Sequence, residues 1–171
     1  MTFAANSALT AAQLNTYLRD NLNETAPAKA TTPGGYFVST ALNAIAERVG
    51  QRQTIFTSET TTSTAYTDLT TNGPTVTATT AGLALVIWTA QLSNSGTGFS
   101  RCSIEVTGAG SSAASDARCI AFSANANDVL QSAMAVFYDD LTPGSNTFTM
   151  KYKVSSGTGT FSNRRLIVLP Y

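Results

Sequence analysis

The stretch NTFTMKYKVS, residues 146–155, alternates apolar and polar side chains along the chain. Its apolar members are Phe148, Met150, Tyr152 and Val154, and its threonines and lysines fall between them. Successive side chains of a strand point to opposite faces, so the two sets lie on opposite faces. The pattern therefore predicts an antiparallel strand with one face in the core and the other in water.

Similar runs lie at short intervals on the N-terminal side of this stretch, and one follows it. Turn sequences such as NGP at 72–74 and LTPGSN at 141–146 separate them. The predicted strands are residues 53–57, 64–69, 75–79, 83–93, 99–106, 117–123, 129–138, 146–155 and 161–169. This spacing predicts a mainly β domain over residues 51–171, an antiparallel β-sandwich that resembles a jelly roll.

One run, LALVIW at 83–88, is apolar on both faces. Such a run suits a central strand, or a strand whose second face is covered by another subunit. The C-terminal LIVLPY, residues 166–171, adds more apolar surface than one small sandwich can bury. We therefore expect a homo-oligomer, with a trimer as the favoured state and Trp88 as a candidate interface residue.

Residues 1–50 differ in character and predict a helical N-terminal region. Thr10 and Gln13 have the spacing of a capping box, and Leu9 and Leu14 that of a hydrophobic staple. The helix is expected to end near Asn23. Its apolar stripe consists of Leu9, Leu14, Tyr17, Leu18 and Leu22.

A segment rich in proline and glycine, ETAPAKATTPGGY at 24–36, follows as an expected extended arm. A second helix is predicted from Phe37 to Val49, with Gly50 as its C-terminal cap. Its apolar stripe consists of Val38, Leu42, Ile45 and Val49. Two short helices cannot bury a core alone, so their stripes must pack on the β domain, on other copies of the chain or on another protein. Anchoring to other copies or to another protein is favoured over a helical cap on the β domain.

The charge pattern excludes several classes of protein. Ten basic and ten acidic residues give a net charge of zero, and histidine is absent. A neutral chain lacks the attraction to phosphates on which general nucleic-acid binding depends. Without histidine, one chain cannot build Ser-His-Asp or Cys-His catalytic groups or histidine-containing zinc sites. We expect no nucleic-acid partner, no catalytic residue, no metal and no cofactor.

No membrane partner is expected either. The longest apolar run, Leu83 to Trp88, is far shorter than the roughly 20 residues that cross a bilayer. The first ten residues have neither the basic nor the long apolar segment of a secretory signal, which favours reduced thiols. A hairpin would place Cys102 opposite Cys119 or Ile120, so a disulfide and two buried thiols remain alternatives, and thiols are favoured.

Two pairs of like charges are the remaining candidates for a site. Neighbours in a strand face opposite ways, so Asp139 and Asp140 cannot share a proton as a catalytic dyad would. They are interpreted as a solvated strand end rather than a cation site. For Arg164 and Arg165, paired or intersubunit arginines are favoured over a phosphate or glycan pocket.

The segment LTAAQLNTYLRDNL at 9–22 resembles the N-terminal element of virion proteins of tailed phages, especially phages of actinobacteria. The strand and turn pattern from TSTAYTDL at 62–69 to the C-terminal LTPGSNTFTMKYKVSSGTGTFSNRRLIVLPY at 141–171 resembles the β-rich domain of the same proteins. The resemblance implies a symmetric, often trimeric, jelly-roll-like module on the particle, and it implies no catalytic residues.

From this resemblance we expect a structural protein of the virion surface that is assembled in the host cytoplasm. A capsid decoration or head-fibre protein is favoured, docked by residues 1–50 on the major capsid protein or another virion protein. A minor tail protein and a glycan-binding attachment module that contacts the host surface remain the alternatives.

Overall fold

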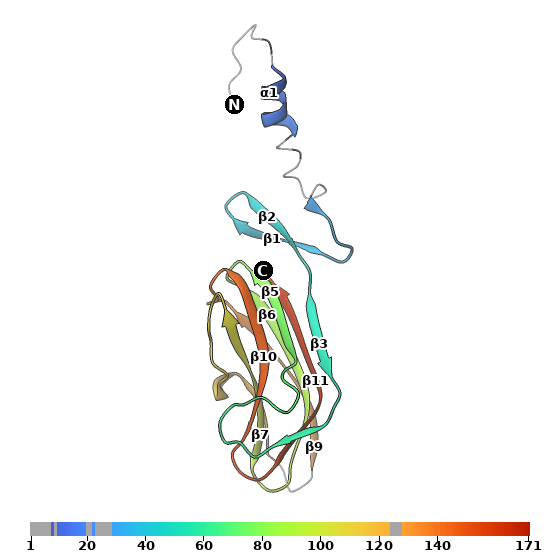
Figure 1. The fold of residues 1–171 in the computed structure, drawn as a ribbon, viewed down its shortest axis with the longest axis vertical. Coiled ribbons are helices and arrows are strands. Elements are labelled where there is room, and N and C mark those ends of the chain that lie inside the picture. The colour runs from blue at the N-terminus through green and yellow to red at the C-terminus, as the bar shows by residue number, and fades with distance from the viewer. Residues whose placement is uncertain (1–7, 9, 20–21, 23–28, 124–127) are drawn as a thin grey trace. The chain divides into compact units, whose positions relative to one another are not determined.

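The computed structural model describes residues 8, 10–19, 22, 29–123 and 128–171. The chain divides into two compact units, Met1–Val49 and Gly50–Tyr171, which are described separately (Figure 1). In the described residues the fold is mainly β, and all the sheets are antiparallel.

The first unit begins with a short helix, α1 (Ala11–Leu14), which continues as a π-helical turn over Asn15–Arg19. The predicted capping box is confirmed, because Gln13 N donates to Thr10 Oγ1 at 3.2 Å and Thr10 N donates to Gln13 Oε1 at 2.9 Å. Leu9, Asn23 and the side chain of Tyr17 lie outside the described residues.

The prediction of a second helix over residues 37–49 is wrong, because this segment forms a β-hairpin. Strands β1 (Tyr36–Ala41) and β2 (Ala44–Arg48) pair antiparallel around a turn in which Asn43 has a φ of 57°. Asparagine adopts this left-handed conformation more readily than other residues with a side chain. The aromatic and β-branched residues at 36–38 favour a strand, and the helical spacing of the apolar residues concealed that preference.

The described part of the predicted arm is held against this hairpin. Glu47 of β2 accepts hydrogen bonds from the backbone amides of Thr31 and Thr32, each at 2.9 Å, and Lys29 Nζ donates to Ile45 O at 3.2 Å. Hydrogen bonds from the Thr31 side chain and from both amides hold the pKa of Glu47 below its ordinary value. Residues 24–28 lie outside the described residues.

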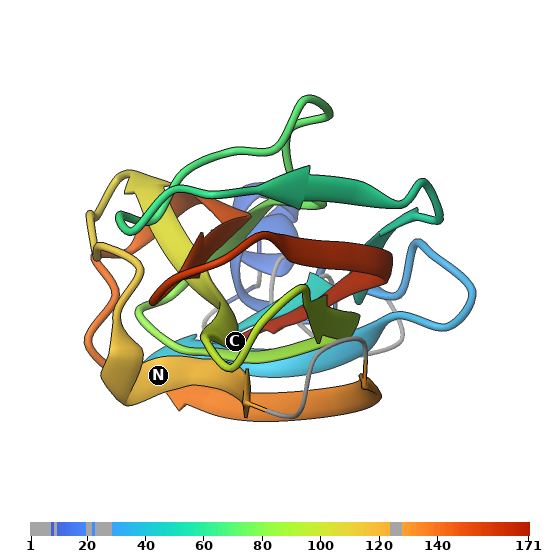
Figure 2. The same cartoon turned by 90° about the horizontal axis from the view of Figure 1, so that it is seen from below.

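The second unit consists of two sheets that face each other across one core (Figure 1). One sheet has the order β5-β10-β7-β8, and the other has the order β3-β11-β6-β9, with β4 also paired to β11. Figure 2 shows the ribbon from below, with β11 in red. At this side of the sheet β11 pairs with β3 and with β4. The strands are β3 (Gln51–Ile55), β4 (Glu59–Thr61), β5 (Thr75–Thr80), β6 (Ala84–Asn94), β7 (Phe99–Gly108), β8 (Cys119–Ser123), β9 (Val129–Tyr138), β10 (Gly144–Val154) and β11 (Gly159–Pro170).

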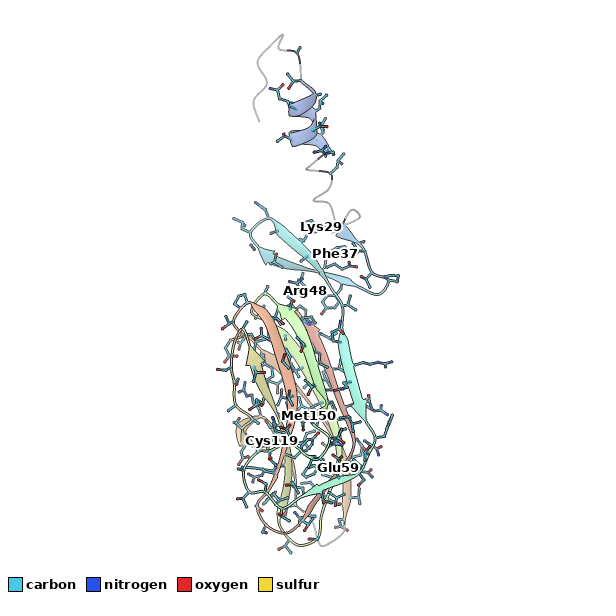
Figure 3. The ribbon with its side chains drawn as sticks, viewed as in Figure 1. Lys29, Phe37, Arg48, Glu59, Cys119 and Met150 are labelled. Atoms are coloured by element: carbon cyan, nitrogen blue, oxygen red, sulfur yellow. The ribbon has the colours of Figure 1, made fainter. Side chains whose placement is uncertain are left out.

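The predicted runs correspond to these strands with one exception. Residues 64–69 form no strand. They contact β10 through a bridge between Thr67 and Tyr152 and through side-chain contacts of Asp68 with Lys151 and of Tyr66 with Lys153. The alternation predicted for residues 146–155 is confirmed, since the four apolar side chains of β10 are at most 1% exposed. Met150 is labelled between the two sheets in Figure 3.

The strand that is apolar on both faces, β6, lies between β11 and β9. Its inward side chains are completely buried, and they include Trp88. The structure therefore places Trp88 in the core of the sandwich, which removes it from any contact surface of the folded domain. The outward side chains of β6 are half-buried.

A buried ion pair attaches the long segment between β3 and β5 to β11. The side chain of Arg164 is 0% exposed, and its Nη2 lies 3.0 Å from Oε2 of Glu59 in β4 (Figure 3 labels Glu59). The guanidinium also donates to the carbonyl oxygens of Thr57, Thr71 and Gly73 at 3.3–3.5 Å. One side chain therefore binds four residues of the segment that joins β3 to β5.

Candidate docking surfaces

The N-terminal helix presents leucine side chains on its surface. Leu14 is 39% exposed and Leu18 is 56% exposed, and the two residues are four positions apart, about one helical turn. Burial of a fully exposed leucine is worth about 1.5–3 kcal/mol, and each of these would gain the share that corresponds to its exposed fraction. A helix this short is not stable without packing. Leu22, from the same predicted stripe, is 63% exposed. These leucines form a candidate contact surface.

The residues predicted as a second stripe do not form one surface. In the hairpin, Val38 pairs with Ala46, and Ile45 pairs with Ser39, so Val38 and Ile45 belong to opposite faces. Val38 is buried, whereas Leu42, at the hairpin turn, is 93% exposed. Val49 follows β2 and is half-buried. Of these four residues, Leu42 is the one whose apolar side chain is strongly exposed.

The outer face of the β3-β11-β6-β9 sheet carries a cluster of apolar side chains, here called the apolar face. Phe137 of β9, Leu85 of β6 and Leu169 of β11 lie side by side in one row. Ile87 and Ile167 form the next row. Phe137 is 53% exposed, and the other four are half-buried. β6 is a central strand of its sheet, which is the first alternative for its sequence. The second alternative, a face of β6 covered by another subunit, would apply to this surface.

The apolar face gives way to polar side chains along the same strands. A shallow hollow of about 540 Å³ is lined there by Thr89, Gln131, Ser132, Ala133, Asn163 and Arg165. A second hollow, on the other side of Arg165, includes Arg52 and Phe56. The Arg165 guanidinium lies 5.8 Å from the ring centre of Phe56, which is 66% exposed. The described lining of both hollows contains no acidic side chain.

The opposite sheet has a polar outer face whose charges compensate one another. Lys151 Nζ lies 2.7 Å from Asp68 and 3.2 Å from Glu105. Asp116 pairs with Arg101 and with Lys153. The hydrogen bond from Lys153 is the main reason why the pKa of Asp116 lies below its ordinary value. This face therefore satisfies its own charges.

The two predicted pairs of like charges behave differently. Arg164 points into the core and Arg165 is exposed, as the opposite facing of strand neighbours predicts, so they do not form one pocket. Asp139 and Asp140 are both exposed just beyond the end of β9. Among the described residues, Arg52, Arg165, Asp139 and Asp140 take part in none of the ion pairs.

Both cysteines are free thiols. The predicted hairpin exists as β7 and β8, with Cys102 opposite Ile120 and Cys119 opposite Ser103. Cys102 is buried, and burial raises the pKa of its thiol. Of the two alternatives from the sequence, the structure has two separate thiols, with Cys119 half-buried.

Within the described residues, no group of three or more cysteine, aspartate or glutamate side chains is arranged to hold a metal ion. None of the described helices has the length and apolar character needed to cross a membrane. The candidate sites that the exposed apolar side chains define are two contact surfaces, namely the leucines of the N-terminal helix and the outer face of the β3-β11-β6-β9 sheet.

No protein-family model and no curated protein matches this chain significantly.

Proposed function

We propose that this chain is a non-enzymatic structural protein of a tailed-phage particle, a capsid decoration or head-fibre protein. Its N-terminal region docks on the major capsid protein or another virion protein, and its β domain projects from the virion surface as a homotrimer. It is assembled in the host cytoplasm. No nucleic acid, membrane, metal or cofactor takes part.

The observation that carries this proposal is the exposed leucine surface on a capped helix in a unit separate from the β domain. Leu14 and Leu18 are exposed although the capping box fixes the start of their helix. A partner that covers them supplies the burial that the helix needs. The resemblance of residues 9–22 to the N-terminal element of phage virion proteins agrees with an anchoring role.

The strand order supports a jelly roll as the projecting domain. Strands β5, β7, β8 and β10 share one sheet, and β3, β6, β9 and β11 share the other. Apart from the short β4, which also pairs with β11, these are eight strands in two facing sheets, and connections that cross between the sheets are typical of a jelly roll. The apolar face, with Phe137 at 53% exposure, supports association of copies through the second sheet.

The test compares two double variants for incorporation into particles. Leu14→Asp with Leu18→Asp places charges on the docking surface. Ala12→Asp with Thr16→Asp places the same charges at the same spacing on other exposed positions of the helix. The first variant should stay folded and trimeric but be absent from particles, and the second should be incorporated. Normal occupancy of particles by the leucine variant would show that the anchor lies elsewhere.

Cryo-electron microscopy of particles that contain the natural chain would decide whether the protein lies on the head or on the tail of the particle. Density on the capsid supports the decoration or head-fibre assignment. Density on the tail would establish the alternative, a minor tail protein.

A glycan-binding attachment module is the second candidate function. The observation in its favour is the pair of hollows around Arg165, where the exposed Phe56 ring lies beside amide and hydroxyl side chains. Aromatic rings and planar polar groups are usual in sugar sites. Selective binding on a glycan array that Phe56→Ala abolishes would support this candidate, and an array without selective binding would count against it.

A further inference from the structure

Some charged residues of the β domain take part in no ion pair, and among the described residues these include as many basic as acidic side chains. Among the described residues of this domain, Arg52, Arg118 and Arg165 have no acidic partner, and Asp128, Asp139 and Asp140 have no basic one. Arg118 is half-buried beside the ring of Tyr138, and Asp128 lies before β9. Arg52, Arg165, Asp139 and Asp140 are exposed, and a second copy of the chain carries the same four charges.

These charges lie at opposite sides of the same sheet. Arg52 belongs to β3 and Arg165 to the adjacent β11, so they form a basic edge. Asp139 and Asp140 follow the last residue of β9, the strand at the other side, and form an acidic edge. The sheet therefore carries a positive patch and a negative patch at two different places.

The apolar face occupies the surface between the two edges. Phe137 and Leu85 lie near the acidic edge, and Ile167 lies next to Arg52 in the register of β11 and β3. A small anionic ligand at Arg165 would leave these apolar side chains in water. A second copy covers the apolar face and brings carboxylates in the same contact, which favours a copy as the occupant.

A three-membered ring has a specific geometric requirement. Its interfaces are heterologous, which means that two different patches of the chain meet at each contact. We propose that the basic edge of one copy pairs with the acidic edge of the next copy, with the apolar face buried beside this contact. The inference rests on the proposed homotrimer and names the two patches that form its interface.

The test uses charge reversal with the full-length chain and light scattering to measure molar mass. Arg52→Glu with Arg165→Glu makes both edges acidic, and Asp139→Arg with Asp140→Arg makes both edges basic. Each double variant should raise the concentration at which the trimer half-dissociates by about tenfold or more, because like charges then face each other. The variant with all four substitutions should regain the trimer.

Two controls separate this contact from general effects. Asp128→Arg reverses an exposed charge that precedes β9, at the other end of that strand, and should leave the trimer intact. Thermal melts followed by circular dichroism should show all variants folded, because the substituted side chains are exposed. Equal mixtures of the two double variants can reassemble fully into a ring with an even number of copies, but a ring of three keeps one like-charged contact.

The outcomes distinguish failure of the interface from failure of the trimer. A wild-type monomer at micromolar concentration would overturn both. A wild-type trimer that both reversals leave unchanged would overturn the pairing of edges while the trimer stands. If that trimer also binds an acidic glycan, and Arg52→Glu with Arg165→Glu abolishes the binding, then the basic edge belongs to a ligand. If the equal mixture of the two double variants recovers the full molar mass of the wild-type assembly, a ring of three copies is excluded.

Discussion

Replacement of Arg164 by methionine tests whether the buried ion pair holds the segment between β3 and β5 in place. Methionine keeps most of the apolar stem but removes the guanidinium from Glu59 and from the ring of Tyr152, whose centre lies 5.5 Å away. Loss of one partner of a buried pair costs about 3–5 kcal/mol. Glu59 keeps hydrogen bonds from Thr71, and its side chain is 11% exposed, so we expect about 3 kcal/mol.

The complementary change, Glu59→Gln, should cost more than Arg164→Met. It leaves the charge of Arg164 in a position that is 0% exposed, where the carbonyl contacts at 3.3–3.5 Å and the ring of Tyr152 are its remaining partners. The double variant has no stranded charge, so its free energy of unfolding should be about 1.5 kcal/mol or more above the value expected if the losses of the two single variants were additive.

Urea unfolding measured by fluorescence and circular dichroism gives these free energies, and the melting temperature of Arg164→Met should fall by roughly 6–12 °C. Each transition must keep the wild-type dependence on urea concentration for the comparison to hold. If the two single effects add to within about 0.5 kcal/mol, or if Arg164→Met is neutral, the pair does not stabilise the segment and the reasoning is refuted.

Three further predictions follow from the same structure. Residues 51–171 should fold without residues 1–50, because the described core lies within this range; an insoluble fragment or one without a cooperative melt would show that the two parts share a core. A thiol reagent should label Cys119 in the native protein and Cys102 only after unfolding, since Cys102 is 0% exposed and burial raises its pKa; equal labelling rates would contradict this. Burial raises the pKa of Glu59, but hydrogen bonds from Thr71 and the charge of Arg164 outweigh it, so the native pKa lies below the ordinary 4.5. The stability that this carboxylate contributes is therefore present above about pH 4.5 and lost as the pH falls through the lower native value, and Glu59→Gln should weaken this loss in acid melts.

The sequence predicted the strands well where a run has one clear interpretation. Residues 146–155 alternate apolar and polar side chains from Thr147 on, and they form most of β10 in the structure. Residues 37–49 were misjudged because their apolar spacing fits a helix, while the turn residue Asn43 and the strand formers before it decide the hairpin. Local pattern alone could not weigh these two signals.

Long-range contacts were beyond the reach of local patterns. The sequence predicts that Arg164 and Arg165 face opposite ways, but it does not reveal which of them is buried. Arg164 is buried because it meets Glu59, which is 105 positions away in the chain. The apolar face was foreseen from β6, whereas its full extent depends on which strands lie beside β6 and in which register.

The order of strands in the two sheets has a consequence for synthesis of the protein. The last two of the described strands in chain order, β10 and β11, each lie between earlier strands, β10 between β5 and β7 and β11 between β3 and β6. Neither sheet can close until these strands are synthesised. Before then β6 can pair with β9 and β7 with β8, but β3 and β5 have no neighbouring strand. A chain that stops before residue 144 lacks the middle of both layers, and it should be degraded or aggregate rather than compete with complete copies.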